Sequence, residues 1–441
     1  MTTPPEGPGA PPSIGNREPG VPAGERVEAH PNLAQPASRS RFTGTRLGRL
    51  GLQRPRRFQP GQAFGLIGAF VVVLVLTHAI TGFATSRPEN LDVPPEIGHE
   101  WLSVSAAWQG LDPYQPLDVL SEALDAPITF LEWSPRPPGV FVIEAPLALV
   151  SFEHLPWLMA VATGVSITFL AVVLRRIFDV RWAFLPGIAA GLALASPIAQ
   201  PILFLNLVVV IVAVLALSIE LAFRGDRYLA GVPLGLVVAV RLWPALLIVT
   251  LLIGRRWKMA AGAGVTASVA TLGGLALPTV SWTRAVVGMQ SAADAWQSHD
   301  GNLSLTGFFG GFDAAPAVLV TVGLVGAVIW YSRRGVTPGA IGLAVAAGAL
   351  ISPLAWGSYL AGGLPAYARL ARRQQHQLAW VAVGGVYATN WIGEWMTVVG
   401  LVAAGLSALS VAGDVLSVPQ SHSEATHIVG PHDLAALEQE D

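Results

Sequence analysis

The chain has 441 residues, of which 52% are hydrophobic and only 12% are charged, and its formal net charge is -2. Soluble domains carry about 25% charged residues, so the composition predicts an all-α, polytopic membrane protein and excludes an ordinary soluble enzyme. The balanced charge provides no basic field for a nucleic acid, and the absence of cysteine excludes disulfides, thiol nucleophiles and Cys-ligated metal centres.

Residues 1–60 are rich in Pro, Gly and Arg and have too few apolar residues to form a core, which predicts a disordered arm. Seven arginines between Arg39 and Arg57, with no acidic residue among them, directly precede the apolar run 63–84. Basic residues beside a span are retained in the cytoplasm. The arm is therefore predicted to be cytoplasmic.

Later apolar runs approach or reach the length of roughly 20 residues that a membrane-spanning helix needs. They are 155–174, 182–201, 203–222, 259–278, 313–332, 336–354, 355–370, 376–393 and 395–412. Basic clusters separate them, at Arg175/Arg176/Arg181, Arg224/Arg227, Arg255/Arg256/Lys258, Arg333/Arg334 and Arg369/Arg372/Arg373. A single threading places all of these clusters in the cytoplasm, as the positive-inside rule requires.

That threading has two conditions. The segment 137–152 must be a re-entrant or surface-lying helix, and 228–254 must form a short hairpin with its tip near Arg241 and Trp243. It gives about twelve crossings, with both termini inside. A second threading makes 137–152 a crossing and 228–254 one long helix, but it places two Arg clusters outside. We prefer the first for this reason.

Two external segments are long enough to build a site, namely the acid-rich 85–154 and 279–312. Together with the spans they complete a transmembrane domain predicted over 61–412. Residues 413–441 are acidic, contain three histidines and lack a core, so they are predicted to be a disordered cytoplasmic tail. We find no internal repeat of the kind that many transporters show.

The stretch 96–114, "EIGHEWLSVSAAWQGLDPY", predicts a helix that Gly110 and Asp112-Pro113 terminate. Its apolar stripe, which includes Trp101 and Trp108, favours a helix lying on the membrane surface. Glu96 and Glu100 are four residues apart and share one face, with His99 beside them. Such a helix presents carboxylates just above the membrane. An amphipathic connector with solvated acids is the alternative.

Several short motifs occur in order along the chain. They are G-x-D-P-Y at 110–114, the Pro-rich "WSPRPPGVFVIEAPLALV" at 133–150, "RLWP" at 241–244 followed by "RRW" at 255–257, N-x-S-L-x-G at 302–307, and S-P-x-x-W at 352–356. In this order the motifs resemble glycosyltransferase family 87, the polyprenyl-phosphate-mannose-dependent α-mannosyltransferases. The resemblance covers roughly residues 60–410. It implies the C-type glycosyltransferase fold, and catalysis outside the plasma membrane.

Counting back from Tyr114, the position of the family's catalytic Asp is occupied by Glu96, while Asp92 and Glu100 lie close by. The chain departs from the family elsewhere. A His that often follows S-P-x-x-W is replaced by Ser358, and a G-Q-x-N element is reduced to Asn206. The resemblance therefore implies a divergent member, in which Glu96 is the first candidate for the catalytic base, Asp92 the second and Glu100 the third.

A lipid-phosphate sugar donor carries its own leaving group, so one general base and a set of phosphate ligands suffice for an inverting transfer. The candidate substrate-binding residues are His99, Tyr114, Arg136, Arg241, Arg284, His299, Asn302, Ser304 and Trp356. Arg241 is the strongest, because an Arg within an apolar run is costly and is kept for function or for pairing with a carboxylate such as Glu144 or Glu220. Both interpretations stay open.

Nothing in the sequence requires a metal or another cofactor, although external carboxylates leave a divalent cation open, and no nucleotide-binding glycine loop occurs. The expected partners are a polyprenyl-phosphate sugar, a glycolipid or glycan acceptor of the cell envelope, and membrane lipids. Two other functions remain: a transporter or flippase for a lipid-linked precursor, and a non-catalytic glycosyltransferase-like scaffold. The sequence does not identify the acceptor, the linkage or the oligomeric state.

Overall fold

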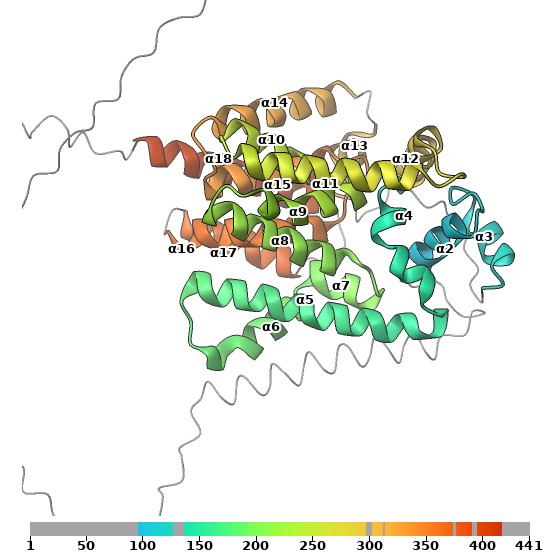
Figure 1. The fold of residues 1–441 in the computed structure, drawn as a ribbon. Helices are drawn as coiled ribbons and strands as arrows, with labels where there is room; N and C mark the ends of the chain where they lie inside the picture. Colours follow the sequence, from blue (N-terminus) through green and yellow to red (C-terminus); the bar gives the residue numbers. More distant parts are fainter. Residues whose placement is uncertain are drawn as a thin grey trace, which may run out of the picture. The chain divides into compact units, whose positions relative to one another are not determined.

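The computed structural model describes residues 96–126, 136–296, 302–311, 314–373, 376–389 and 395–416. The chain divides into two units, 1–57 and 58–441, and all described residues belong to the second. These residues form helices, without a β-strand and with one isolated bridge between Asn302 and Trp356 (Figure 1). The predicted all-α class is therefore confirmed. The predicted N-terminal arm and first span lie outside the described residues.

Most of the helices make up the main body of the bundle. They are α5 (Leu155–Phe178), α6 (Leu185–Leu194), α7 (Ser196–Leu203), α8 (Val208–Arg224), α9 (Tyr228–Val240), α10 (Ala245–Ile253), α11 (Trp257–Leu275), α14 (Ala315–Ser332), α15 (Pro338–Ile351), α16 (Leu364–Arg372), α17 (Gln377–Thr389) and α18 (Trp395–Leu416). The 3₁₀ helices η4 (Trp182–Phe184) and η5 (Gly357–Gly363) precede α6 and α16.

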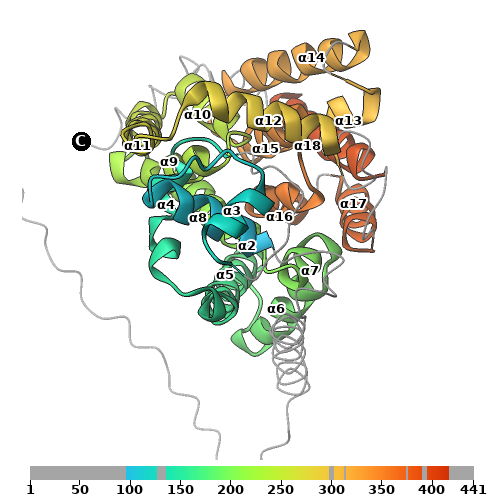
Figure 2. The same ribbon diagram turned by 90° about the vertical axis from the view of Figure 1, so that its right-hand side faces the viewer.

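The remaining helices gather at one end of the bundle (Figures 1 and 2). They are α2 (Glu96–Trp108), α3 (Leu117–Ala123), α4 (Val140–Ile143), α12 (Trp282–Trp296), α13 (Leu305–Phe309) and the 3₁₀ helices η2 (Ala145–Leu149) and η3 (Phe152–His154). We call this the site end.

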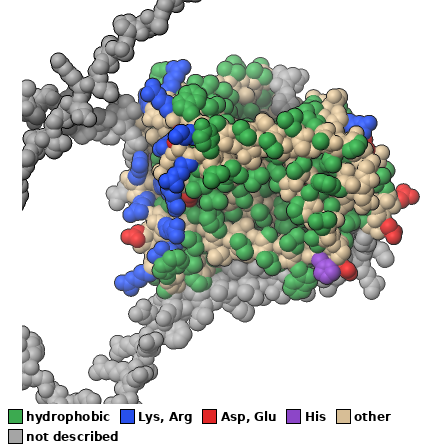
Figure 3. All heavy atoms as spheres, viewed as in Figure 1, with side chains coloured by type: hydrophobic (Ala, Val, Ile, Leu, Met, Phe, Trp, Pro, Cys, Tyr) green, Lys and Arg blue, Asp and Glu red, His purple; other side chains and the backbone are tan. Residues whose placement is uncertain are grey.

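Lysine and arginine side chains gather at the opposite end, which we call the basic end (Figure 3). Contacts between its loops connect the clusters seen in the sequence. Asp226 accepts hydrogen bonds from the backbone N–H groups of Lys258 and Met259 at the start of α11, and Arg369 forms an ion pair with Glu220. The basic clusters therefore lie at one end, as the preferred threading requires.

Few of the described helices reach the length of a full span. Phe152–Phe178 and Ala315–Ser332 are long and apolar enough to cross a membrane, and Trp182–Leu194 with Ser196–Leu203 is a third candidate, bent by 74°. The other apolar helices are shorter or broken. The structure is therefore consistent with a membrane protein, and the expected number of about twelve crossings stays a prediction.

The segment 228–254 is a hairpin rather than one long helix. Helix α9 ends at Val240, Arg241 adopts an extended backbone, and α10 begins after Pro244. Proline lacks an N–H donor and disfavours helical backbone in the residue before it, which explains the break. Helix α9 packs against α11 through Gly231 and Gly262, where an added Cβ would overlap with backbone atoms of the other helix.

The segment 137–152 consists of the four-residue α4 and the 3₁₀ helix η2, and it lies beside α2. It is too short and irregular to be a crossing helix, so the second threading is wrong on both segments.

Helix α2 ends at Trp108, before Gly110, which has a positive φ of 78°. The predicted helix is thus confirmed, but the prediction that it lies on a surface is wrong. Both faces of α2 are buried, because small residues such as Ser103, Ala106 and Ala107 allow neighbouring elements to approach closely. The Trp101 and Trp108 indole N–H groups donate to the carbonyl groups of Val150 and Phe141.

Candidate active site

The first residue of α2 is held by the elbow between α7 and α8. The Glu96 backbone N–H donates to the Phe204 carbonyl at 2.9 Å. Leu205 then takes a left-handed backbone, with φ 51°, and this turns the chain so that Asn206 faces Glu96. Two segments that are 110 residues apart in sequence therefore meet at the start of α2.

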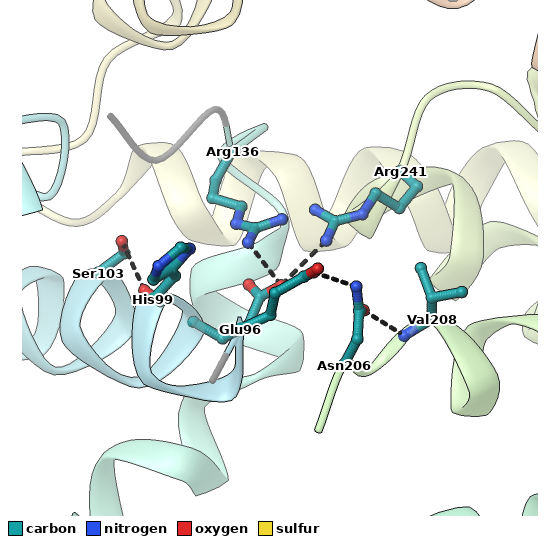
Figure 4. A network of polar contacts seen from close by, with 8 residues as sticks. Glu96, His99, Ser103, Arg136, Asn206, Val208 and Arg241 are labelled. Carbon is teal, nitrogen blue, oxygen red and sulfur yellow. Dashed lines mark hydrogen bonds and ion pairs between the residues drawn. The ribbon is translucent and has the colours of Figure 1, made fainter. Parts of the chain in front are cut away.

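The Asn206 amide donates to Glu96 Oε2 (Figure 4). Its oxygen Oδ1 accepts a hydrogen bond from the Val208 backbone N–H at 2.8 Å. The second bond fixes which side of the amide faces Glu96, because an oxygen that accepts from the backbone leaves the NH₂ group for the carboxylate. Asn206 was noted in the sequence only as a remnant of a family motif, and the list of candidate site residues omitted it.

Glu100 is the anchor of two arginines. Arg136 Nη2 lies 2.6 Å, and Arg241 Nη2 lies 2.9 Å, from the same oxygen, Glu100 Oε1. The Glu100 side chain is 3% exposed, and the arginine side chains are 9% and 12% exposed. Arg136 comes from the segment before α4 and Arg241 from the tip of the α9–α10 hairpin, so Glu100 joins three separate elements. Of the two acids expected to pair with Arg241, Glu220 instead binds Arg369.

A third carboxyl group completes the cluster. Glu144, between α4 and η2, is 8% exposed, and its carboxyl group lies within hydrogen-bonding reach of that of Glu100. We call Glu96, Glu100, Glu144, Arg136 and Arg241 the Glu–Arg cluster. From the sequence, Glu144 was expected only as a partner for Arg241, and no sequence pattern indicates its contact with another carboxyl group.

The acids of the cluster titrate differently because their neighbours differ. Burial raises the pKa of Glu96 to about 7, although Arg136, Arg241 and Asn206 act in the opposite direction. Burial also raises the pKa of Glu100, but the two guanidinium groups outweigh it and hold that pKa below its usual range. At neutral pH, Glu100 is therefore ionised and Glu96 is poised between its two forms, as a general base requires.

His99 lies on α2 beside these acids and is neutral at physiological pH. Burial and the nearby Arg136 lower its pKa to about 4, with Glu100 acting in the opposite direction. A neutral imidazole adds no positive charge to the site, so His99 can take part in hydrogen bonds but not in an ion pair.

Both arginines retain hydrogen-bonding capacity. The Nε atoms of Arg136 and Arg241 are buried and have no hydrogen-bond partner in the part of the chain that the structure describes. Buried donors without an acceptor are costly. Tyr359 of η5 interacts electrostatically with both guanidinium groups, and its ring stacks on Trp243 with centroids 5.1 Å apart. The cluster thus has a rigid aromatic support and free donors.

Tyr114 and Arg284 belong to a second, peripheral arrangement. Arg284 of α12 forms an ion pair with Asp112 at 2.6 Å, and Asp112 also accepts from the Tyr114 backbone N–H. Arg284 is 55% exposed. Tyr114 is buried with its ring edge-to-face against Phe141. Arg284 therefore fastens the G-x-D-P-Y turn, and its ion pair among the described residues is with Asp112 rather than with the Glu–Arg cluster.

Asn302, Ser304 and Trp356 lie together, but their polar groups are used within the protein. Asn302 Oδ1 accepts from the backbone N–H groups of Ser304 and Ala355, and the Ser304 hydroxyl accepts from the Gly307 N–H at the start of α13. Trp356 packs edge-to-face on Trp296. The two sequence motifs are thus joined to each other, and their predicted contact with substrate stays a prediction.

Asp92 and His299 lie outside the described residues. Among the residues that the structure does describe, no group of three or more His, Asp or Glu side chains is arranged to hold a metal ion. The predicted absence of a metal or other cofactor is not tested by this finding.

The chain can also be compared with known proteins. Residues 136–355 match the model of glycosyltransferase family 87. The chain belongs to this family. Comparisons with curated proteins and with solved structures gave no significant match. Membership makes the protein a membrane glycosyltransferase, which acts on a sugar donor and an acceptor.

The matched region is narrower than the resemblance noted in the sequence. It contains Arg136, Glu144, Arg241 and Asn302, but it begins after α2 and ends before Trp356. The roles of Glu96 and Glu100 therefore depend on the geometry of the cluster rather than on the family match.

Proposed function

We propose that this protein transfers a sugar from a polyprenyl-phosphate donor to a hydroxyl group of an envelope glycolipid or lipoglycan, with inversion at the anomeric carbon. The resemblance of its motifs favours mannose. The observation that carries the proposal is that Glu96 and the guanidinium groups of Arg136 and Arg241 occupy one buried cluster. The site end would face the outside of the plasma membrane, because the basic end is retained in the cytoplasm.

In this mechanism the Glu96 carboxylate accepts the proton of the acceptor hydroxyl. The acceptor oxygen forms a bond to the anomeric carbon while the bond between that carbon and the phosphate oxygen breaks. The lipid phosphate leaves with the electron pair of that bond, and the proton remains on Glu96. One carboxylate suffices, since no covalent sugar–enzyme intermediate forms.

Arg136 and Arg241 would hold the phosphate. Guanidinium groups bind phosphate through charge-assisted hydrogen bonds, and the Nε donors of both residues lack an acceptor among the described residues. The Oε1 contacts of Glu100 fix both side chains before the donor arrives, so little reorganisation is needed on binding.

The decisive experiment measures sugar transfer from labelled polyprenyl-phosphate mannose in membranes that contain wild type, Glu96→Gln, Asp92→Asn or Glu122→Gln. Glu122 is an exposed acid on α3, at the same end of the bundle, and serves as the matched control. We expect Glu96→Gln to lose at least about 100-fold in rate, while Glu122→Gln stays near wild type.

Other outcomes separate the alternatives. Loss only in Asp92→Asn would assign the base to Asp92. Unchanged transfer in both variants, with envelope glycans altered only by deletion of the protein, would favour a scaffold. Accumulation of the donor on the inner leaflet after deletion would favour a flippase.

A further inference from the structure

The contact between Glu100 and Glu144 is unusual because both side chains are acidic and buried. Their residues are 2% and 8% exposed, and their carboxyl groups lie within hydrogen-bonding reach of each other. The Oε2 atoms of both have no hydrogen-bond partner in the described part of the chain. Two carboxylate ions in such contact repel each other, and neither can donate a hydrogen bond to the other. A single proton held between the two carboxyl groups removes the repulsion and supplies the hydrogen bond.

The position of the ion pairs shows which group keeps the proton. Both guanidinium groups bind Glu100 Oε1, at 2.6 and 2.9 Å, and no ion pair joins Glu144 to an arginine among the described residues. Glu100 is therefore stabilised as the anion. Burial and then the Glu100 carboxylate hold the pKa of Glu144 well above its usual range.

This proton changes the charge that a ligand meets. With Glu96 ionised, as the proposed transfer requires, the Glu–Arg cluster has one negative charge in excess if Glu144 is also ionised, and no net charge if Glu144 keeps its proton. Inside a buried site, a single uncompensated negative charge would repel an anion strongly.

We propose that Glu144 keeps a proton in contact with Glu100, and that this proton removes a negative charge that would otherwise repel a phosphodiester monoanion bound at Arg136 and Arg241. The inference rests on the proposed function, since it concerns the charge of the donor at the same site. It makes Glu144 a positioning and charge-setting residue rather than a catalytic one.

Three charged groups act on Glu144 directly, namely Glu100 of α2, Arg136 before α4 and Arg241 at the hairpin tip. Around these three groups lie Glu96 and His99 of α2 and Tyr359 of η5. Burial raises the pKa of Glu96 to about 7 and holds the pKa of Glu144 well above its usual range. A fall in affinity with rising pH that disappears in Glu144→Gln and persists in Glu96→Gln is therefore the signature of Glu144.

The test is equilibrium binding of a farnesyl phosphate methyl diester, which carries one negative charge, to the purified full chain in detergent. Affinity is measured by intrinsic tryptophan fluorescence from neutral to strongly alkaline pH in wild type, Glu144→Gln and Glu96→Gln. In wild type, the affinity should fall by at least about tenfold as Glu144 loses its proton and adds a negative charge beside the bound anion. Glu144→Gln should lose this alkaline fall, and Glu96→Gln should retain it.

An alkaline fall of equal size in Glu144→Gln and wild type would overturn the proposal. If Glu144→Gln does not fold, the infrared spectrum of the wild type decides, because a protonated buried carboxyl group has its own carbonyl stretching band. Persistence of that band above neutral pH supports the proposal, and its absence at pH 7 refutes it. If the band is present but no variant binds the diester at any pH, the proposed donor class fails while the shared proton stands.

Discussion

The two ends of the bundle use charged residues in opposite ways. At the basic end, most Lys and Arg side chains are exposed to solvent, as in Arg176, Arg255 and Arg333. At the site end, Arg136 and Arg241 are buried and meet on one carboxylate oxygen. A solvated Arg costs little, whereas a buried one is retained only with a partner or a function. The basic end thus fixes orientation, and the site end performs chemistry.

Replacing one arginine at each end tests most directly whether the two ends have separate roles. Arg241→Gln should reduce sugar transfer by at least about 100-fold, because a fixed cation at the departing phosphate is lost. Arg255→Gln, at the basic end, should stay within about twofold, since its side chain is exposed. Initial transfer rates in membranes with matched protein amounts measure both. Equal losses in the two variants would contradict the separation of roles.

Replacing one acid at each end should reduce the stability of the protein by different amounts. Glu100→Gln leaves two buried guanidinium groups without their anion and should destabilise the protein by about 3–5 kcal/mol. Glu220→Gln breaks a more exposed pair with Arg369 and should cost about 1 kcal/mol. Thermal unfolding in detergent, followed by circular dichroism, compares the two. A larger shift for Glu220→Gln would show that the Glu–Arg cluster is not the tighter unit.

Asn206 gives a finer test within the site end. Asn206→Ser keeps an acceptor for the Val208 N–H but loses the donor to Glu96, and Asn206→Asp places a second carboxylate there. A donor to the carboxylate lowers the pKa of Glu96, so its loss should move the acid limb of the pH–rate profile upward by about one unit. Asn206→Asp should move it further. Unshifted limbs in both variants would show that Asn206 does not tune Glu96.

The smallest effect is expected at the edge of the site end. Arg284→Gln and Asp112→Asn each break a partly exposed ion pair, so each should change the free energy of unfolding by about 1 kcal/mol or less. Transfer rates should remain within about twofold of the wild-type rate. A large loss of donor affinity in Arg284→Gln alone would instead restore its predicted role as a phosphate ligand.

Local features of the site were within reach of the sequence. The spacing of Glu96 and Glu100 sets them on one face of α2, and Gly110 follows the end of that helix. Pro244 interrupts the helix after Arg241 and so creates the hairpin. Each of these features depends on the backbone preferences of neighbouring residues. The burial of α2 was missed, since its small residues look neutral in a hydropathy pattern but allow close packing.

Pairings between residues far apart in the chain could not be predicted from the sequence. Arg241 lies 141 positions from Glu100, and apolar runs and charge clusters do not specify which acid it meets. Asn302 and Ser304 were assigned to substrate because polar residues in an external loop suggest binding. The structure shows that their hydrogen bonds order the motif at 302–307 and join it to the motif at 352–356, and an isolated motif does not distinguish such a structural use from substrate binding.

The contact of α9 with α11 has a consequence for how this protein can vary. At Gly231 and Gly262 the two helices touch backbone to backbone, so even one methyl group would push α9 aside. Because Arg241 directly follows the far end of α9, a displacement of this helix would also displace the guanidinium group. Substitutions at a distant, chemically inert contact should therefore behave as defects of the site itself.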